Sequence, residues 1–204
     1  MNMKQLTYFL LLSTAGFISC RQTGTDRYES LVKKELSSNK KVKDIFFGIS
    51  LGMTSKEFYM HCWNMNKKGI FTDGSANTAV LYKLNHNELR HPAEMNFYPE
   101  FHEGRIHKMA AGFQYTAWAP WNKNLYSDSL LTDVVNLYKK WYPKGNPFIT
   151  ISDEKKGNIY VKVDGNRQII IGRYDDVEVK ADYTDLLVEQ QMKKENLIKQ
   201  NRNP

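Results

Sequence analysis

Apolar side chains recur every three to four residues in one segment of the first half of the chain. This spacing predicts an amphipathic helix over about residues 55–68. Thr54 and Glu57 stand at the spacing of a capping box that starts a helix, and Gly69 suits the position after its last turn. The expected apolar stripe consists of Phe58, Tyr59, Cys62, Trp63 and Met65.

The same helical spacing returns in the second half of the chain. We expect this helix to begin at Ser127 or Asp128 and to end before Pro143 and Gly145. Its apolar positions are Leu130, Leu131, Val134, Val135, Leu137, Tyr138, Trp141 and Tyr142.

Elsewhere the pattern changes to an alternation of apolar and polar residues, which is typical of half-buried strands. Pro99 is expected in an edge strand or at a β-bulge, because proline cannot donate a hydrogen bond to a neighbouring strand. The segment 105–117 has the clearest alternation, with Met109, Ala111, Phe113 and Tyr115 on one face. The predicted strands are 45–49, 78–84, 93–101, 105–117, 148–152, 158–163, 167–174 and 177–183.

The order of elements is a helix and then a meander of strands, twice over. Antiparallel runs with helices laid on one face indicate the α+β class. Asp164-Gly165 joins two of the strands as a tight hairpin. We therefore expect two helix-plus-sheet units, 42–117 and 118–184, packed as one compact unit, and a helical tail over 185–204.

The first twenty residues indicate export and a lipid anchor. A single Lys4 precedes a short apolar run, which is typical of a secretory signal and too brief to cross a bilayer. Phe17-Ile18-Ser19-Cys20 resembles the lipobox of bacterial lipoproteins, which implies cleavage after residue 19 and lipidation of Cys20. An ordinary signal peptide with a chance cysteine is the alternative. Residues 20–41 would then be the anchor and a tether with a short helix capped by Asp26.

A lipid anchor implies the bacterial cell envelope as location and the membrane as a partner. In lipoproteins of the Bacteroidetes type, which this segment resembles, an acidic run after the cysteine is associated with export to the cell surface. No such run follows Cys20, so the resemblance implies the periplasmic side over the cell surface. The chain carries 29 basic and 22 acidic residues, but the lysines are dispersed as doublets, so we expect a solvated surface and no nucleic-acid partner. Cys62 has no second thiol to pair with once Cys20 is lipidated, and we expect it to pack in the interior.

Three family resemblances concern function. Gly52-Met53-Thr54 resembles the helix start of small outer-membrane assembly lipoproteins of the SmpA/OmlA type. The doubled helix-plus-sheet order is similar to the β-lactamase-inhibitor-protein-like fold. The chain as a whole, including residues 47–54, looks most like uncharacterised small lipoproteins of Bacteroidetes. These resemblances imply a non-enzymatic binding or assembly role and transfer no site residue.

Motifs for catalysis and metal binding are weak. Gly48-Ile49-Ser50-Leu51-Gly52 matches the nucleophile-elbow string, but the expected helix starts only after Thr54 and the last histidine is His107. The pairs His86 with His91 and His102 with His107 lack a metalloprotease spacing. The acidic run from Asp175 to Asp185 is expected on the solvent-exposed face of its strand. We therefore expect no catalytic residue, no metal site and no cofactor.

The loop Trp118-Ala119-Pro120-Trp121 is the strongest candidate for binding. With Tyr115 and Tyr126 nearby, two tryptophans around a proline can form a rigid aromatic patch, and such residues dominate binding hot spots. Alternatively, both rings seal the junction between the two units. The leading hypothesis is a lipid-anchored envelope protein that binds a protein partner without catalysis. The alternatives are an inhibitor or immunity protein against a toxin or hydrolase, and a small envelope hydrolase or metal-binding protein.

Overall fold

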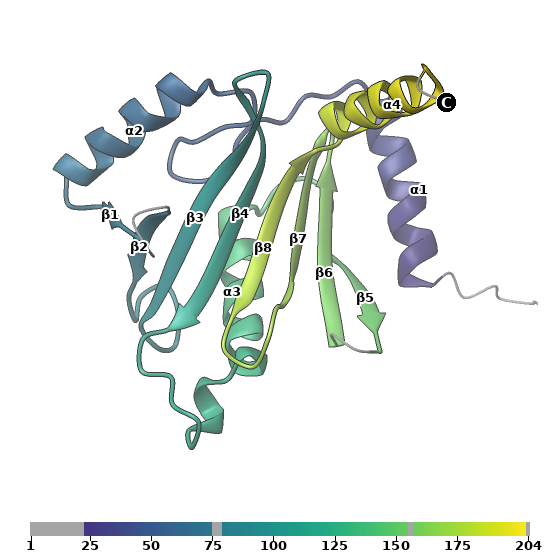
Figure 1. Cartoon of the computed structure of the whole chain (residues 1–204). Helices are drawn as coiled ribbons and strands as arrows, with labels where there is room; N and C mark the ends of the chain where they lie inside the picture. Colours follow the sequence, from purple (N-terminus) through teal and green to yellow (C-terminus); the bar gives the residue numbers. More distant parts are fainter. Residues whose placement is uncertain (1–22, 75–78, 155–156, 203–204) are drawn as a thin grey trace, which may run out of the picture.

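A computed structural model describes residues 23–74, 79–154 and 157–202. In these ranges the chain forms an α+β fold, as the sequence predicts, and its strands form one eight-stranded antiparallel sheet (Figure 1). The helices are α1 (Gly24–Ser37), α2 (Ser55–Lys67), α3 (Ser127–Trp141) and α4 (Leu186–Arg202), with a short 3-10 helix η2 (Lys123–Leu125). The strands are β1 (Phe71–Asp73), β2 (Val80–Leu84), β3 (Ala93–His102), β4 (Arg105–Tyr115), β5 (Ile149–Asp153), β6 (Gly157–Asp164), β7 (Arg167–Arg173) and β8 (Val179–Asp185). Neither the joining of the two meanders nor the short strand β1 was predicted from the sequence.

The sheet joins the two predicted units through their last strands. Its strand order is β1-β2-β3-β4-β8-β7-β6-β5, so each meander is continuous and β4 pairs with β8 in the middle. Ala111 lies opposite Ala181 at this seam. A bulge at Glu100/Phe101 follows Pro99 in β3, in agreement with the expectation for a proline within a strand.

One face of the sheet is the main core, and α3 covers its centre. The register places Met109 opposite Tyr183 and Tyr183 opposite Ile169, so buried side chains of three neighbouring strands share this face. α3 contacts β4, β7 and β8 and buries Leu130, Val134 and Tyr138. Figure 1 shows α3 behind the middle of the sheet, where it spans both units.

Residues 44–50 form a tight hairpin, so the strand predicted over 45–49 is wrong. Asp44 bridges Ser50, and the Ile49 amide donates a hydrogen bond of 2.9 Å to the Phe46 carbonyl. Phe47 (φ 50°) and Gly48 (φ 82°) occupy the two central positions, where the turns favoured in hairpins have positive φ. The apolar run resembles a strand because its side chains are buried, although the chain reverses within it.

Aromatic rings of this hairpin fill the core beside α3. The centroid of the Phe46 ring lies 4.9 Å from that of Phe97, and the centroid of the Phe47 ring lies 4.4 Å from that of Tyr82. Phe47 also packs edge-on against Trp141 at the end of α3. The hairpin therefore covers the part of the first unit that α3 does not reach.

α2 starts as predicted but buries fewer residues than expected. The capping box of Thr54 and Glu57 is present, and Gly69 has a φ of 69° after the last turn. Phe58 is fully buried, and Cys62 and Met65 are half-buried. Tyr59 and Trp63, assigned to the same stripe, are exposed instead. α2 packs against the edge strand β1, where the narrow stripe of residues 58, 62 and 65 suffices.

Two other helix starts differ from the sequence prediction. The cap of α1 is Thr23, and Asp26 stands three residues later, where its carboxylate accepts a hydrogen bond from the Thr23 amide. α3 begins without a side-chain cap, since the Ser127 hydroxyl donates to the Asp175 carbonyl of the loop before β8. A long-range contact therefore replaces the local cap expected from Ser127 or Asp128.

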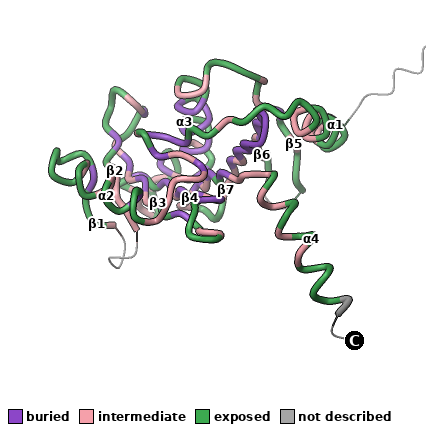
Figure 2. The backbone as a smooth tube through the Cα atoms, turned by 90° about the horizontal axis from the view of Figure 1, so that it is seen from above, coloured by how far each residue is buried: buried purple, intermediate pink, exposed green. Residues whose placement is uncertain are grey.

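α1 lies on the other face of the sheet, and α4 projects from its end. Gln168 neighbours the buried Ile169 in β7 and so points to the opposite face, where its side chain accepts a hydrogen bond of 2.6 Å from the Tyr28 hydroxyl. The Glu35 carboxylate accepts from the Gly165 amide at 2.7 Å. This part of the segment predicted as a tether is thus packed against the sheet. Figure 2 shows α4 extending away from the body and exposed along most of its length.

Two buried cations share one buried carboxylate where β6 turns into β7. Asp164 Oδ2 lies 3.2 Å from Lys162 Nζ and 3.1 Å from Arg167 Nη2, and all three side chains are at most 4% exposed. The Asn146 amide donates to the other carboxylate oxygen at 2.8 Å. Lys162 also donates to the Lys144 carbonyl at 2.9 Å. The carboxylate thus neutralises charges that water cannot reach.

We predict that Asp164→Ala lowers the free energy of unfolding by about 3–5 kcal/mol, because it leaves the buried Lys162 without a counter-ion and Arg167 with only the exposed Asp44 carboxylate at 3.3 Å. Asp128→Ala is the matched control, since it removes the exposed carboxylate that pairs with Arg173 and should cost about 0–1 kcal/mol. Urea unfolding of both variants measures the difference. Equal losses for the two substitutions would contradict the role of Asp164.

Candidate binding surfaces

The loop between β4 and α3 holds one tryptophan in solvent. Trp121 is 86% exposed, the largest exposure among the bulky apolar side chains of the described residues. The loop around it is braced, because the Tyr126 hydroxyl donates a hydrogen bond of 2.7 Å to the Pro120 carbonyl. The Trp118 ring packs beside Tyr126 with 6.0 Å between centroids. Figure 1 shows this loop at the lower end of the molecule.

The other aromatic residues proposed for binding, which are Tyr115, Trp118 and Tyr126, are less exposed than Trp121. Tyr115 is 1% exposed and donates a hydrogen bond of 2.7 Å to the buried Asp133 carboxylate. It therefore belongs to the core and cannot contact a partner in this structure, which corrects the sequence-based assignment. Burial raises its pKa above the ordinary value for tyrosine. Trp118 and Tyr126 are half-buried and support the loop, so Trp121 alone projects from it.

The predicted lipidation site lies outside the described residues. Cys20 and the predicted signal 1–19 precede Thr23, where the described chain begins. Within the described ranges, no helix has the length and apolar character needed to cross a bilayer.

Ser50 of the nucleophile-elbow string lies on the hairpin of residues 44–50. An elbow places its serine directly between a strand and a helix, whereas α2 begins only at Ser55. In the described part of the chain, Ser50 has no hydrogen bond to a histidine. The ring of His61, the histidine nearest in sequence, is bonded to the Phe47 carbonyl at 2.8 Å.

The histidine pairs are engaged in packing. The rings of His102 and His107 meet edge to face with 5.9 Å between centroids, and burial lowers the pKa of His107. His86 is bonded to the Arg90 carbonyl at 3.1 Å, and His91 packs against Tyr115. No three His, Cys, Asp or Glu side chains of the described ranges are grouped closely enough to hold a metal ion.

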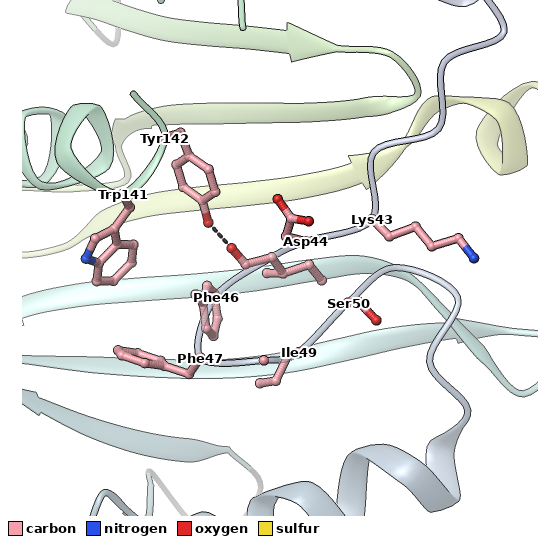
Figure 3. A pocket seen from close by; sticks show the side chains of 10 residues that line it. Lys43, Asp44, Phe46, Phe47, Ile49, Ser50, Trp141 and Tyr142 are labelled. Carbon is pink, nitrogen blue, oxygen red and sulfur yellow. Dashed lines mark hydrogen bonds between the residues drawn. The ribbon is translucent and has the colours of Figure 1, made fainter. Parts of the chain in front are cut away.

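A hollow of about 480 Å³ lies between the hairpin and the end of α3. In Figure 3 Trp141 and Tyr142 form one wall, and Phe46 and Phe47 lie across from them. The Tyr142 hydroxyl donates to the Ile45 carbonyl and contacts the Tyr183 hydroxyl at 2.7 Å. These contacts join the hairpin to the core, so we assign them a structural role.

The outer face of α2 is a larger apolar surface that the sequence analysis missed. Tyr59, Met60 and Trp63 are 50%, 52% and 54% exposed. Together with Ser55 and Lys56 they line a shallow hollow of about 650 Å³. The width of the apolar pattern in α2 could have revealed this surface. Positions 59, 60 and 63 form a second apolar stripe beside the buried one at 58, 62 and 65.

The chain matches no protein-family model, no curated protein and no solved structure. The two exposed aromatic surfaces are the structural basis for a functional proposal.

We predict that the Cys62 thiol reacts slowly at neutral pH. Burial raises its pKa to about 11 from a reference of 9.0, so the reactive thiolate is scarce below that pH. At pH 8, alkylation of folded Cys20→Ser protein by iodoacetamide should be about 100-fold slower than after unfolding in urea, and it should rise about tenfold per pH unit towards pH 11. Cys62→Ser in the same background gives the blank. Similar rates in folded and unfolded protein would contradict the burial of this thiol.

Proposed function

We propose that this chain is a lipid-anchored protein of the bacterial cell envelope that binds a protein partner and carries out no catalysis. Its signal-like start and the lipobox-like segment ending at Cys20 support the anchor. The observation that carries the binding role is Trp121, which is 86% exposed on a braced loop. We further propose that the protein faces the periplasm, because no acidic run follows Cys20.

The position of Trp121 suits an interface. Tryptophan buries a large apolar area at small entropic cost and is among the residues most enriched at binding hot spots. The side chain has no packing role in the described structure that would explain its presence. The hydrogen bond from Tyr126 to Pro120 holds the loop in place, so a partner would meet a preformed contact. The exposed ring therefore supports recognition of another protein.

We predict that Cys20→Ser abolishes lipidation. Full-length protein made in a bacterial host with an alkyne analogue of palmitate should be labelled and should sediment with membranes. The Cys20→Ser variant should be unlabelled and released from them, because the acyl chains supply the attachment. Cys62→Ser is the matched control and should behave as the unaltered protein. Continued labelling of the Cys20→Ser variant would overturn the proposed anchor.

We predict that Trp121 contacts the partner directly. A photo-cross-linking amino acid at position 121 should capture a protein in intact cells, and one at the exposed Leu197 of α4, at the other end of the sheet, should not. The purified partner should then bind the Trp121→Ala variant at least about 30-fold more weakly than the unaltered protein, as expected of a hot-spot residue. Leu197→Ala should bind normally. Unchanged affinity of the Trp121→Ala variant would place the interface elsewhere.

A further inference from the structure

The exposed apolar residues of α2 form one continuous surface, which we call the α2 face. It consists of Lys56, Tyr59, Met60, Trp63 and Lys67, with three apolar side chains about half exposed. Apolar residues scattered singly over a surface are normal, but these stand at adjacent positions of one helix and border a hollow of about 650 Å³. Contiguous exposure of this kind marks an interaction site in a soluble protein.

Contacts within the protein hold the aromatic rings of the α2 face in place. The Tyr59 and Tyr98 hydroxyls lie 2.5 Å apart in a hydrogen bond, which links α2 to β3. The Lys67 ammonium lies 3.4 Å from the centroid of the Trp63 ring. Buried packing of α2 is supplied by the stripe of residues 58, 62 and 65, so the exposed rings are not required for it. The face is therefore ordered before any partner arrives, which lowers the entropic cost of binding.

The charged residues of the α2 face itself are both lysines. Lys56 and Lys67 belong to it, and Lys68 caps the helix next to it. The one carboxylate of α2, Glu57, is engaged in the capping box with Thr54. A second copy of this chain would bring lysines against lysines at a symmetric contact, which disfavours self-association. The complementary surface is apolar with carboxylates at its rim.

The position of the α2 face favours a protein over a lipid surface. Figure 1 shows α2 at the β1 edge of the sheet and α1 at the β5 edge. α1 begins at Gly24, four residues after the proposed lipidation site at Cys20. Eight strands at a spacing of about 4.8 Å separate the two edges by roughly 30 Å. The proposed anchor would therefore join the molecule at the edge of the sheet opposite α2, and membrane attachment does not need the α2 face.

We propose that the α2 face binds an acidic amphipathic segment of a protein partner. Apolar side chains of this segment would fill the hollow between Met60 and Trp63, and its carboxylates would pair with Lys56 and Lys67. Binding of a helix through apolar positions spaced three and four residues apart is a common form of such recognition. The inference rests on the proposed binding function and specifies the chemistry of the partner.

The test begins with a photo-cross-linking amino acid at position 60 of the full-length lipidated protein in native membranes. The captured peptide is sequenced by mass spectrometry. We expect one segment in which apolar residues are flanked by an excess of Asp and Glu. A lipid adduct, a second copy of this chain, a segment without excess carboxylates, or no adduct would each overturn the proposal. Capture at position 121 with failure at position 60 would leave the proposed function standing, and failure at both positions would overturn both.

The second step uses the captured segment as a synthetic peptide. Trp63→Ala should weaken its binding at least about 30-fold, and circular dichroism should show an unchanged fold because the ring is half exposed. Lys56→Glu/Lys67→Glu should weaken binding and reverse its dependence on salt concentration, because attraction to the carboxylates becomes repulsion. Lys139→Glu/Lys140→Glu on α3 carries the same charge change and should leave the affinity within about twofold, allowing for weak long-range attraction. Equal effects of the two double variants would overturn recognition at the α2 face.

Discussion

The pairing of β4 with β8 is the constraint that organises the rest of the molecule. It joins two meanders into one sheet and places the small side chains of Ala111 and Ala181 opposite each other. Because the seam lies in the middle of the sheet, the central helix α3 has to cover strands of both units, and it contacts β4, β7 and β8. The other helix of the repeated plan, α2, is left at the β1 edge. The exposed face of α2 follows from this asymmetry between two units with the same order of elements.

The hairpin of residues 44–50 occupies the space that α2 would fill in a symmetric arrangement. Its tip holds Phe47 at a φ of 50°, a left-handed conformation that costs a residue with a side chain roughly 1–2 kcal/mol. The ring lies against Tyr82, Phe71 and Trp141, so burial offsets the strain. Gly48 takes the next position with no such penalty. The hairpin is thus held in place by packing that its own sequence does not reveal.

Local signals in the sequence predicted the fold class, the capping box at Thr54 and the buried face of β4. Each depends on residues within one turn or one strand. The failures depend on distant contacts. The run 45–49 is as apolar as a buried strand, and the Ser127 hydroxyl bonds to Asp175 of a remote loop. Tyr115 does not belong to the proposed binding site, because its hydroxyl donates a hydrogen bond to Asp133 of α3 in the core. Exposure of Trp121 and Trp63 likewise depends on which helix covers which strand.

The two exposed aromatic surfaces differ in character and stand at opposite ends of β4. Thr54, the cap of α2, bridges Arg105 at the start of β4, and the Trp121 loop follows Tyr115 at its end. Eleven residues of strand separate these points by roughly 33 Å.

An interface of standard size covers about 800 Å² on each partner, a patch roughly 30 Å across. A partner of that size reaches one surface at a time, so joint engagement requires a larger interface or two partners. Trp121 offers a single projecting side chain, whereas the α2 face combines three apolar side chains with Lys56 and Lys67, and this difference in chemistry favours two distinct partner segments.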